Sequence, residues 1–224
     1  MSRACTWACR PLHNLMKAWS RALQEAQKMV RTSWAVSRIN WELERAWWGL
    51  LRIQLPAEGI AARFQDEAAC LERLVEQRWG KHVSCPRCGA GRPFIVPAVA
   101  RWQCRECRHQ FSATSGTMLG YSKLPLRTWF LSADYMIRHA PAYVHHLMPA
   151  LEEYAAWTGL HYNTASRLRR RTYDDLRTNG GQGFLGKLVL VNPVKPPADT
   201  TPDSPDFLVW LRKEAEDRSI PLEI

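Results

Sequence analysis

The chain has 224 residues, of which 46% are hydrophobic and 23% charged, so it can bury a core and is not disordered by composition. Its 31 Lys and Arg against 21 Asp and Glu give a formal net charge of +10, which favours a polyanionic partner, nucleic acid before a membrane surface. No run of roughly 18 apolar residues predicts a membrane span, and no continuous apolar segment near the N-terminus predicts secretion, so we expect a cytoplasmic protein without a membrane partner.

Residues 1–60 are predicted to be helical and rich in tryptophan. Apolar residues recur every three or four positions over residues 12–30 and 39–51, as expected of apolar helix faces, and Pro56 and Gly59 then break the pattern. We expect a helical hairpin that packs on the rest of the chain or on a second copy, which would give a homodimer. The alternative is a helix that lies on DNA or on a membrane surface through its basic side.

Two C-x2-C pairs, Cys85 with Cys88 and Cys104 with Cys107, are separated by 15 residues. This spacing predicts one closed, structural Zn²⁺ site with four thiolate ligands. Residues 94–102 and 110–111 favour short antiparallel strands. Residues 61–122 are therefore predicted to form a zinc-ribbon domain that depends on its metal for folding.

Other residues near these cysteines have weaker claims. His82 and His109 flank the pairs and are alternative ligands, although four thiolates already complete a zinc site. A redox role is disfavoured because no βαβ pattern surrounds either pair. A helix is predicted over residues 66–79, with Cys70 in the core.

Residues 123–180 are predicted to form three helices, over residues 126–139, 147–157 and 163–178. A turn around Gly159 separates the second from the third, and the apolar spacing around it is typical of a helix-turn-helix, whose last helix enters the major groove of duplex DNA. The candidate DNA contacts are early residues of this last helix and the arginines along it: Tyr162, Asn163, Thr164, Arg167, Arg169, Arg170 and Arg171.

Residues 181–224 are rich in glycine and proline, and we predict a flexible linker that ends in a short helix over residues 207–216. One short strand is expected over residues 187–191. Residues 181–186 match G-x-G-x-x-G, but a dinucleotide fingerprint follows a strand and opens a helix. Here the run follows a helix and leads into a predicted strand, so we exclude nucleotide binding by this motif.

From residue 64 to residue 175 the chain resembles a known family. The residues that carry the resemblance are FQDEAACL at 64–71, RW at 78–79, CPRCG at 85–89, WQCRECRHQFS at 102–112 with Thr114, Gly116 and Thr117, and SKLPLRTWF at 122–130. Their order and spacing resemble the N-terminal zinc-ribbon region of bacterial insertion-sequence transposases, in which a helix-turn-helix follows. The resemblance implies binding to the DNA ends of a mobile element, with the four paired cysteines as zinc ligands.

The resemblance does not extend to the catalytic part of that family. There, a ribonuclease-H-like domain follows, in which three acidic residues hold two metal ions. This chain has no Val-Asp-Glu-Thr type motif after Asp175, and Asp199, Asp203 and Asp206 lie in the predicted linker, where no rigid scaffold would hold them. We therefore expect no catalytic residues, no strand-transfer activity and no enzyme.

The sequence thus predicts a mainly α-helical protein with a small β zinc ribbon, in four segments: residues 1–60, 61–122, 123–180 and 181–224. The leading hypothesis is a nucleoid-associated protein that binds double-stranded DNA and is a truncated or repurposed relative of a transposase. The alternative is an adaptor whose ribbon and Trp-rich helices dock a protein partner. The hypotheses differ in whether Arg167, Arg169 and Arg170 project from one exposed basic face.

Overall fold

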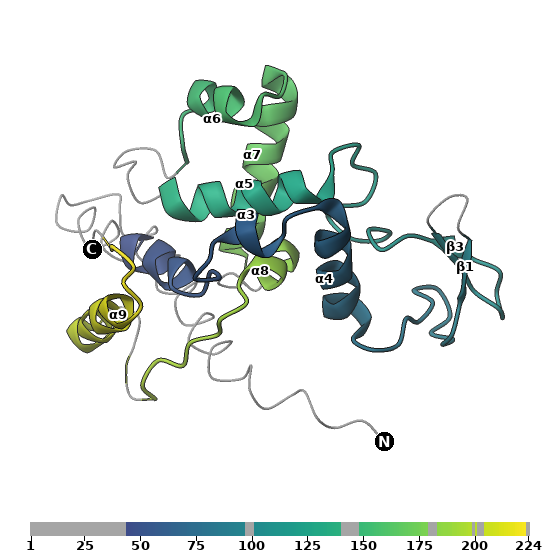
Figure 1. Cartoon of the computed structure of the whole chain (residues 1–224), viewed down its shortest axis with the longest axis horizontal. Helices are drawn as coiled ribbons and strands as arrows, with labels where there is room; N and C mark the ends of the chain where they lie inside the picture. The colour runs from purple at the N-terminus through teal and green to yellow at the C-terminus, as the bar shows by residue number, and fades with distance from the viewer. Residues whose placement is uncertain are drawn as a thin grey trace, which may run out of the picture.

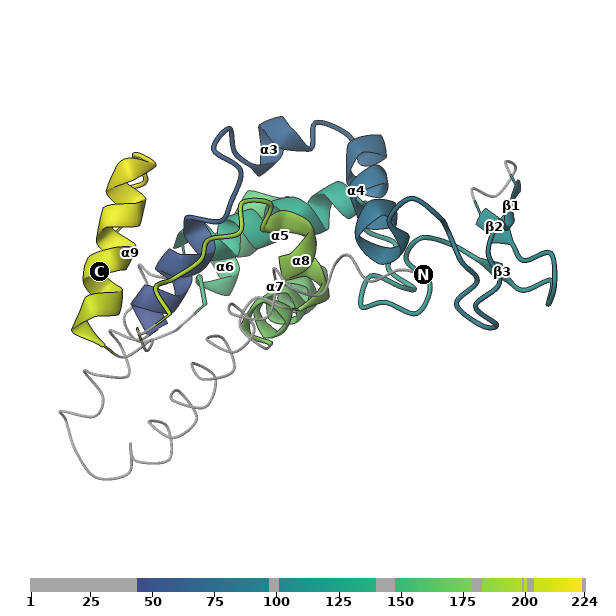
Figure 2. The same cartoon turned by 90° about the horizontal axis from the view of Figure 1, so that it is seen from below.

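A computed structural model describes residues 44–96, 101–139, 148–178, 183–198, 200 and 204–222, and Figure 1 shows their arrangement. This part of the chain is mainly helical with one three-stranded antiparallel sheet, as predicted. The predicted helices before residue 44, and the homodimer contact expected of them, lie outside the described residues. The sheet lies at one end of the molecule, and the helix that precedes it separates it from the other helices in both views (Figures 1 and 2).

A helix over residues 44–52 comes first in the described part of the chain. The elements that follow are α3 (Ile60–Arg63), α4 (Glu67–Trp79), β1 (Phe94–Val96), β2 (Arg101–Gln103), β3 (Gln110–Phe111), α5 (Leu126–His139), α6 (Leu151–Thr158), α7 (Tyr162–Arg177), α8 (Phe184–Val189) and α9 (Pro205–Asp217). None of the helices described is long and apolar enough to cross a bilayer. The predicted helices over residues 66–79, 126–139 and 207–216 are confirmed as α4, α5 and α9.

Helix α5 passes through the centre of the helical part (Figure 1). Its apolar residues recur every three or four positions, and Trp129, Phe130 and Met136 are among those buried. Glu67, at the start of α4, caps the N-terminus of α5: the N–H groups of Leu126 and Arg127 donate to its two carboxylate oxygens at 2.7 and 3.1 Å. A negative charge there stabilises the unpaired amides of the first turn.

The turn between α6 and α7 forms around Gly159, as predicted. Gly159 has φ 64° and ψ 13°, a left-handed conformation that glycine adopts without strain, and its N–H donates to the carbonyl of Ala155 at 3.0 Å. Helix α7 begins at once, at Tyr162, and packs against both α5 and α6.

Three buried hydroxyl groups join α5, α6 and α7. Ser132 Oγ lies 2.8 Å from Thr172 Oγ1 and also forms a hydrogen bond with the hydroxyl of Tyr154. All three side chains are fully buried, so each needs a partner within the protein. The cluster therefore fixes the relative positions of the three helices.

The predicted start of the second helix of this unit, at residue 147, is wrong. Residue 147 lies outside the described residues, residues 148–150 are not helical, and α6 begins at Leu151. The cause is Pro149, whose ring disfavours a helical conformation in the residue before it and which lacks an N–H for a helix interior. The carbonyl of Pro149 instead accepts a hydrogen bond from the Arg169 guanidinium.

The predicted strand over residues 187–191 is also wrong, because residues 184–189 form helix α8. Leu185, Leu188 and Val189 are fully buried, and Val194 beyond the helix is buried too. Asp175 on α7 caps the helix, since its carboxylate accepts hydrogen bonds from the N–H groups of residues 184–186 at 2.8–3.1 Å. Residues 184–194 therefore pack on the core through these apolar side chains and do not form a linker.

The glycine run before α8 has a packing role at Gly183. A Cβ at this position would lie 2.1 Å from the backbone oxygen of Asp175, so only glycine fits there. The run leads into a helix, which corrects the prediction that it leads into a strand. It still follows helix α7 and not a strand, so it does not form a dinucleotide fingerprint.

The end of the predicted N-terminal helical segment packs on the rest of the chain. Trp48, Leu50 and Leu51 are buried in the same core as α5, α7 and α8. Glu44 forms an ion pair with Arg177 of α7, with 2.5 Å between Oε1 and Nη2, and the carboxylate side chain is only 5% exposed. This part of the segment is thus integral to the helical fold.

Candidate functional site

The ribbon sheet has the order β1–β2–β3, with antiparallel neighbours. Ile95 pairs with Trp102, and Trp102 in turn pairs with Phe111. For the described residues of the predicted ranges 94–102 and 110–111, these strands confirm the β-structure. They bring the loop before β1 and the loop between β2 and β3 together, and each of these loops carries one cysteine pair.

The two cysteine loops have the same backbone geometry. In the first, the N–H of Gly89 donates to the carbonyl of Cys85 at 2.9 Å, and the N–H of Cys85 donates to Ala90 at 2.8 Å. In the second loop, the N–H of Arg108 donates to the carbonyl of Cys104 at 3.1 Å, and the N–H of Cys104 donates to the carbonyl of His109 at 2.9 Å. The residue after the second cysteine has a positive φ in both, 75° at Gly89 and 56° at Arg108.

The four sulfur atoms form one cluster. The Sγ atoms of Cys85 and Cys107 lie 3.7 Å apart, those of Cys88 and Cys104 lie 3.5 Å apart, and all four lie within 4.8 Å of one another. A tetrahedron with Zn–S bonds of about 2.3 Å has edges of about 3.8 Å. The four cysteines are therefore able to bind one zinc ion, with no open position left for a substrate.

Neither flanking histidine belongs to this cluster. His82 is exposed, and the His109 ring lies parallel to Phe111, with 6.1 Å between the ring centroids. Among the described residues, the group placed to hold a metal ion consists of the four cysteines. The alternative in which a histidine replaces a thiolate is not supported.

Without metal, the thiols differ in acidity. Burial acts to raise the pKa of Cys85, but hydrogen bonds from the backbones of Cys88 and Arg87 outweigh it and lower the pKa to about 7. For Cys88, the backbone of Ala90 acts to lower the pKa, but hydrogen bonds to Cys107 and Cys104 raise it to about 12. Because zinc binds thiolates, its binding releases protons, and acid weakens it.

Aromatic side chains attach the ribbon to α4. The Trp79 ring, at the end of α4, meets Trp102 edge-on at 5.6 Å, and Trp102 stacks on Phe111 at 6.0 Å. Phe111 is buried within the ribbon. Cys70, within α4, is buried in the helical core, as predicted. After β3 the chain returns to that core through Ala113 and Leu119.

The predicted DNA contacts on α7 divide into two groups. Tyr162, Asn163, Arg167 and Arg170 are exposed, and Thr164 is half-buried. Asn163, Arg167, Arg170 and Asp174 are spaced by three or four residues and follow one outer stripe of the helix. Arg170 lies 3.9 Å from Asp174, and both side chains are largely exposed.

Arg169, which is half-buried, and Arg171, which is exposed, both contact other parts of the fold. Arg169 donates to the carbonyl of Pro149, ahead of α6. Arg171 donates to the carbonyl of Met118 and lies over the Trp129 ring, 5.1 Å from its centroid. These two arginines hold α7 against its neighbours, which sequence spacing alone could not distinguish from DNA contacts.

Several carboxylates near the helical part have structural partners. Glu67 caps α5, Asp175 caps α8, and Glu44 pairs with Arg177. Burial raises the pKa of Asp175, although three backbone N–H groups act to lower it. Asp199 and Asp203 lie outside the described residues, and Asp206 lies in the first turn of α9. The absence of catalytic residues stays a prediction.

The segment that follows β3 was not predicted to have a role. Residues 112–122 form a loop whose hydroxyl groups line a pocket against the ribbon. The signal was present in the sequence as a run of Ser, Thr and Gly, S-A-T-S-G-T over residues 112–117. Such a run also fits an ordinary turn, so it does not identify a site alone.

Comparisons with known proteins agree with the metal centre. Residues 65–110 match the family model of the transposase zinc-ribbon domain, which confirms the resemblance over the ribbon. An uncharacterized protein in the transposable element ISH50 of Halobacterium salinarum is 32% identical over 78 residues, 34% of this chain and 26% of that protein. The match thus spans about a quarter of this relative's length. No solved structure gives a significant match.

Proposed function

We propose that this chain binds double-stranded DNA through a helix-turn-helix made of α6 and α7, with a structural zinc ribbon beside it. The observation that carries the proposal is the outer stripe of α7, where Asn163, Arg167 and Arg170 are exposed on the first turns after a tight glycine turn. Helices that read the major groove contact base edges with residues in their early turns.

The chemistry of these side chains suits DNA. An arginine pairs with guanine O6 and N7 through two hydrogen bonds, and an asparagine pairs with adenine in a similar way. Tyr162 and Thr164, beside them, are suited to phosphate contacts. Arg169 and Arg171 act by holding α7 in position, through the carbonyls of Pro149 and Met118.

The zinc has a structural role in this proposal. Four thiolates close the coordination shell, so the ion would not activate water or a substrate. Its ligands hold the two cysteine loops together. The folded ribbon is then joined to the helical core on both sides along the chain, by Trp79 before it and by Ala113 after it.

The wider role follows from the ribbon's relatives. Because residues 65–110 match a transposase zinc-ribbon domain, the DNA we propose is the end of a mobile element, bound in the cytoplasm at the nucleoid. We further propose that the chain binds this DNA without catalysing strand transfer. Incubating zinc-loaded protein with element ends and Mg²⁺ tests this, and cleaved or joined strands would contradict it.

Fluorescence anisotropy of the zinc-loaded chain on a blunt duplex, over a salt series, tests DNA binding. We expect Arg167→Ala with Arg170→Ala to weaken binding at least about tenfold and to lower the salt slope by about 1 for each of these arginines that pairs with a phosphate. A matched control removes two exposed positive charges elsewhere, Arg63→Ala on α3 and Lys213→Ala on α9. Equal losses of affinity in both double variants would show that affinity depends on net charge alone, which would contradict the proposal.

A second function, a protein-interaction adaptor, is favoured by one observation on the ribbon. On β1, Phe94 is 40% and Ile95 is 65% exposed, and exposed apolar side chains on a small sheet suit a protein partner. If the chain does not bind duplex DNA even at low salt, this adaptor function becomes the better explanation of the ribbon. Its test is whether Ile95→Lys abolishes binding to a partner isolated with the wild-type chain.

A further inference from the structure

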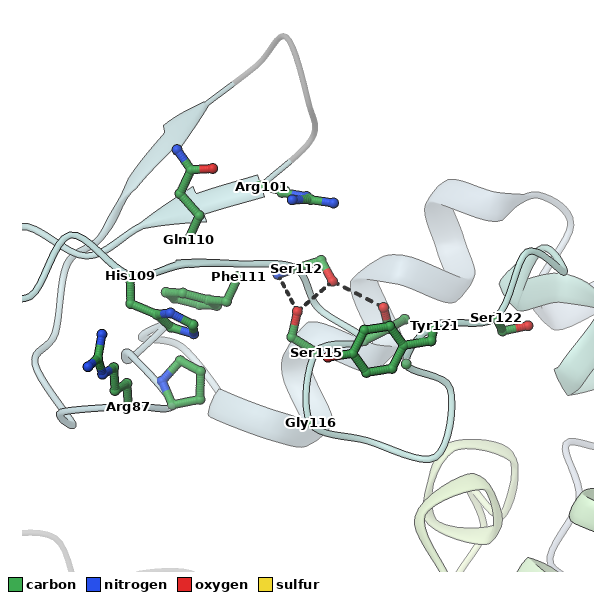
Figure 3. A pocket seen from close by; sticks show the side chains of 13 residues that line it. Arg87, Arg101, His109, Gln110, Phe111, Ser112, Ser115, Gly116, Tyr121 and Ser122 are labelled. Atoms are coloured by element: carbon green, nitrogen blue, oxygen red, sulfur yellow. Dashed lines mark hydrogen bonds between the residues drawn. The ribbon is translucent and has the colours of Figure 1, made fainter.

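A pocket of about 560 Å³ lies between the cysteine loops of the ribbon and the loop over residues 112–122. In Figure 3, Arg87 and His109 lie at one end of the pocket and Tyr121 lies on the loop at the other, with Ser112 and Ser115 between them. Arg101 reaches it from β2. This size is typical of sites that hold a small molecule or one protruding group of a larger ligand.

The lining of the pocket selects for a negative charge. Among the described residues that form it, two are arginines, one is a histidine and none is acidic. Arg87 and Arg101 are both exposed, so their charged groups are available to a ligand. Guanidinium groups bind phosphate oxygens through paired hydrogen bonds.

Hydroxyl groups cover the middle of the pocket. Ser112 Oγ lies 3.0 Å from Ser115 Oγ and 3.1 Å from Thr114 Oγ1, and the N–H of Ser112 donates to Ser115 Oγ at 2.9 Å. Hydroxyls both donate and accept hydrogen bonds, so this part of the surface suits a sugar or a phosphate ester.

At the far end, Tyr121 presents a flat aromatic surface. Its side chain is fully exposed, and its backbone has φ 59°, in the left-handed region. No core contact explains a large aromatic side chain in such a position. An exposed ring of this kind is a platform on which an unstacked base can stack.

We propose that this pocket holds one unpaired nucleotide of a DNA ligand, with its flanking phosphates against the basic side chains of Arg87, His109 and Arg101 and its base against Tyr121. The inference rests on the proposed function, since it assumes that the chain binds DNA, and it adds that the ribbon binds a single-stranded part. Bases inside a duplex are stacked on each other and cannot reach the ring, so an overhang or a frayed end is required.

The test compares a blunt duplex with the same duplex that carries a short single-stranded overhang, using the full zinc-loaded chain. The overhang is expected to raise the affinity of the wild-type protein about tenfold, in line with one stacked base. Tyr121→Ala is expected to remove this gain and Tyr121→Phe to retain it. Arg87→Ala with Arg101→Ala is expected to remove the gain and leave the affinity for the blunt duplex within about twofold. Zinc content checks that each variant is folded.

Each other outcome decides between the two proposals. If the overhang gives no gain, or if Tyr121→Ala keeps it, the pocket proposal is wrong while duplex binding by α7 can stand. If the arginine variant weakens blunt and overhang binding equally, the pocket contacts duplex phosphates, and the single-strand assignment is overturned. If the wild-type chain binds the overhang DNA and a free single strand but not the blunt duplex, the pocket proposal holds and the α7 proposal fails.

Discussion

The ribbon and the helical part of this chain are stabilised in different ways. Among the described residues, the buried core of the ribbon consists of Cys85, Cys104 and Phe111, and the geometry of the ribbon is defined by two hydrogen-bonded loops and four sulfurs. The helical part buries a long series of aliphatic and aromatic side chains from residue 46 to residue 215. From this comparison we expect the small unit to depend on its metal for folding and the larger one to depend on apolar burial.

The largest expected effect comes from removing the metal. Chelation of zinc, or Cys104→Ser, is expected to unfold residues 84–111 at a cost on the order of 10 kcal/mol while α5–α8 stay folded. Regional hydrogen exchange together with zinc content measures this. Cys70→Ser, which changes a buried thiol in α4 outside the cluster, is the control and should retain zinc. Protected ribbon amides in the metal-free protein would show that the two parts do not differ as described.

The reverse experiment acts on the helical part. Leu188→Ala in α8 is expected to lower the free energy of unfolding by about 2–5 kcal/mol, because it leaves a cavity in a fully buried site. Urea unfolding followed by circular dichroism measures the change, and the zinc content is expected to stay the same. Val209→Ala on α9, where the side chain is 65% exposed, should change stability by less than about 0.5 kcal/mol. Equal effects of the two substitutions would mean that α8 is not part of the core.

The smallest effect distinguishes the two cysteine loops. Arg108, like Gly89, has a positive φ, so Arg108→Gly relieves backbone strain and is expected to stabilise the ribbon by up to about 1 kcal/mol. Gly89→Ala is expected to destabilise it by about as much. Competition with a chelator gives the zinc affinity of each variant. Glu106→Gly, in the same loop as Arg108, gains no such relief and is the control; a gain there would rule out the explanation from φ.

The ribbon was the part of the structure that could be predicted almost completely from the sequence. Four cysteines at fixed spacing define the loops, and the β-favouring residues between them define strands that start at Phe94 and Arg101. Helix α5 was equally predictable because its apolar residues follow a regular spacing and a proline precedes it. In both regions the local sequence preferences favour the same conformation that the tertiary structure has.

The prediction failed where distant residues decide the local structure. Residues 184–189 have glycine and β-branched neighbours that suggest a linker and a strand, but the carboxylate of Asp175 caps them as a helix. One failure has a local cause: α6 begins at Leu151 and not at residue 147, because Pro149 disfavours a helical conformation in the residue before it. On α7, Arg169 and Arg171 differ from Arg167 and Arg170 because they donate to carbonyls elsewhere in the chain, which a single sequence does not reveal.

The anchoring of α7 has a consequence for the length of the DNA that this chain would engage. Arg171 holds the helix to Met118, in the loop that carries Tyr121, while Arg169 holds it to Pro149, ahead of α6, and Asp175 holds it to α8. The outer stripe of α7 and the pocket beside the ribbon therefore sit at a set separation. If both bind DNA, the fold sets the number of base pairs that lie between the duplex site and the single-stranded end of the DNA. Changing the spacing between these two features in a DNA substrate should then give one optimum length.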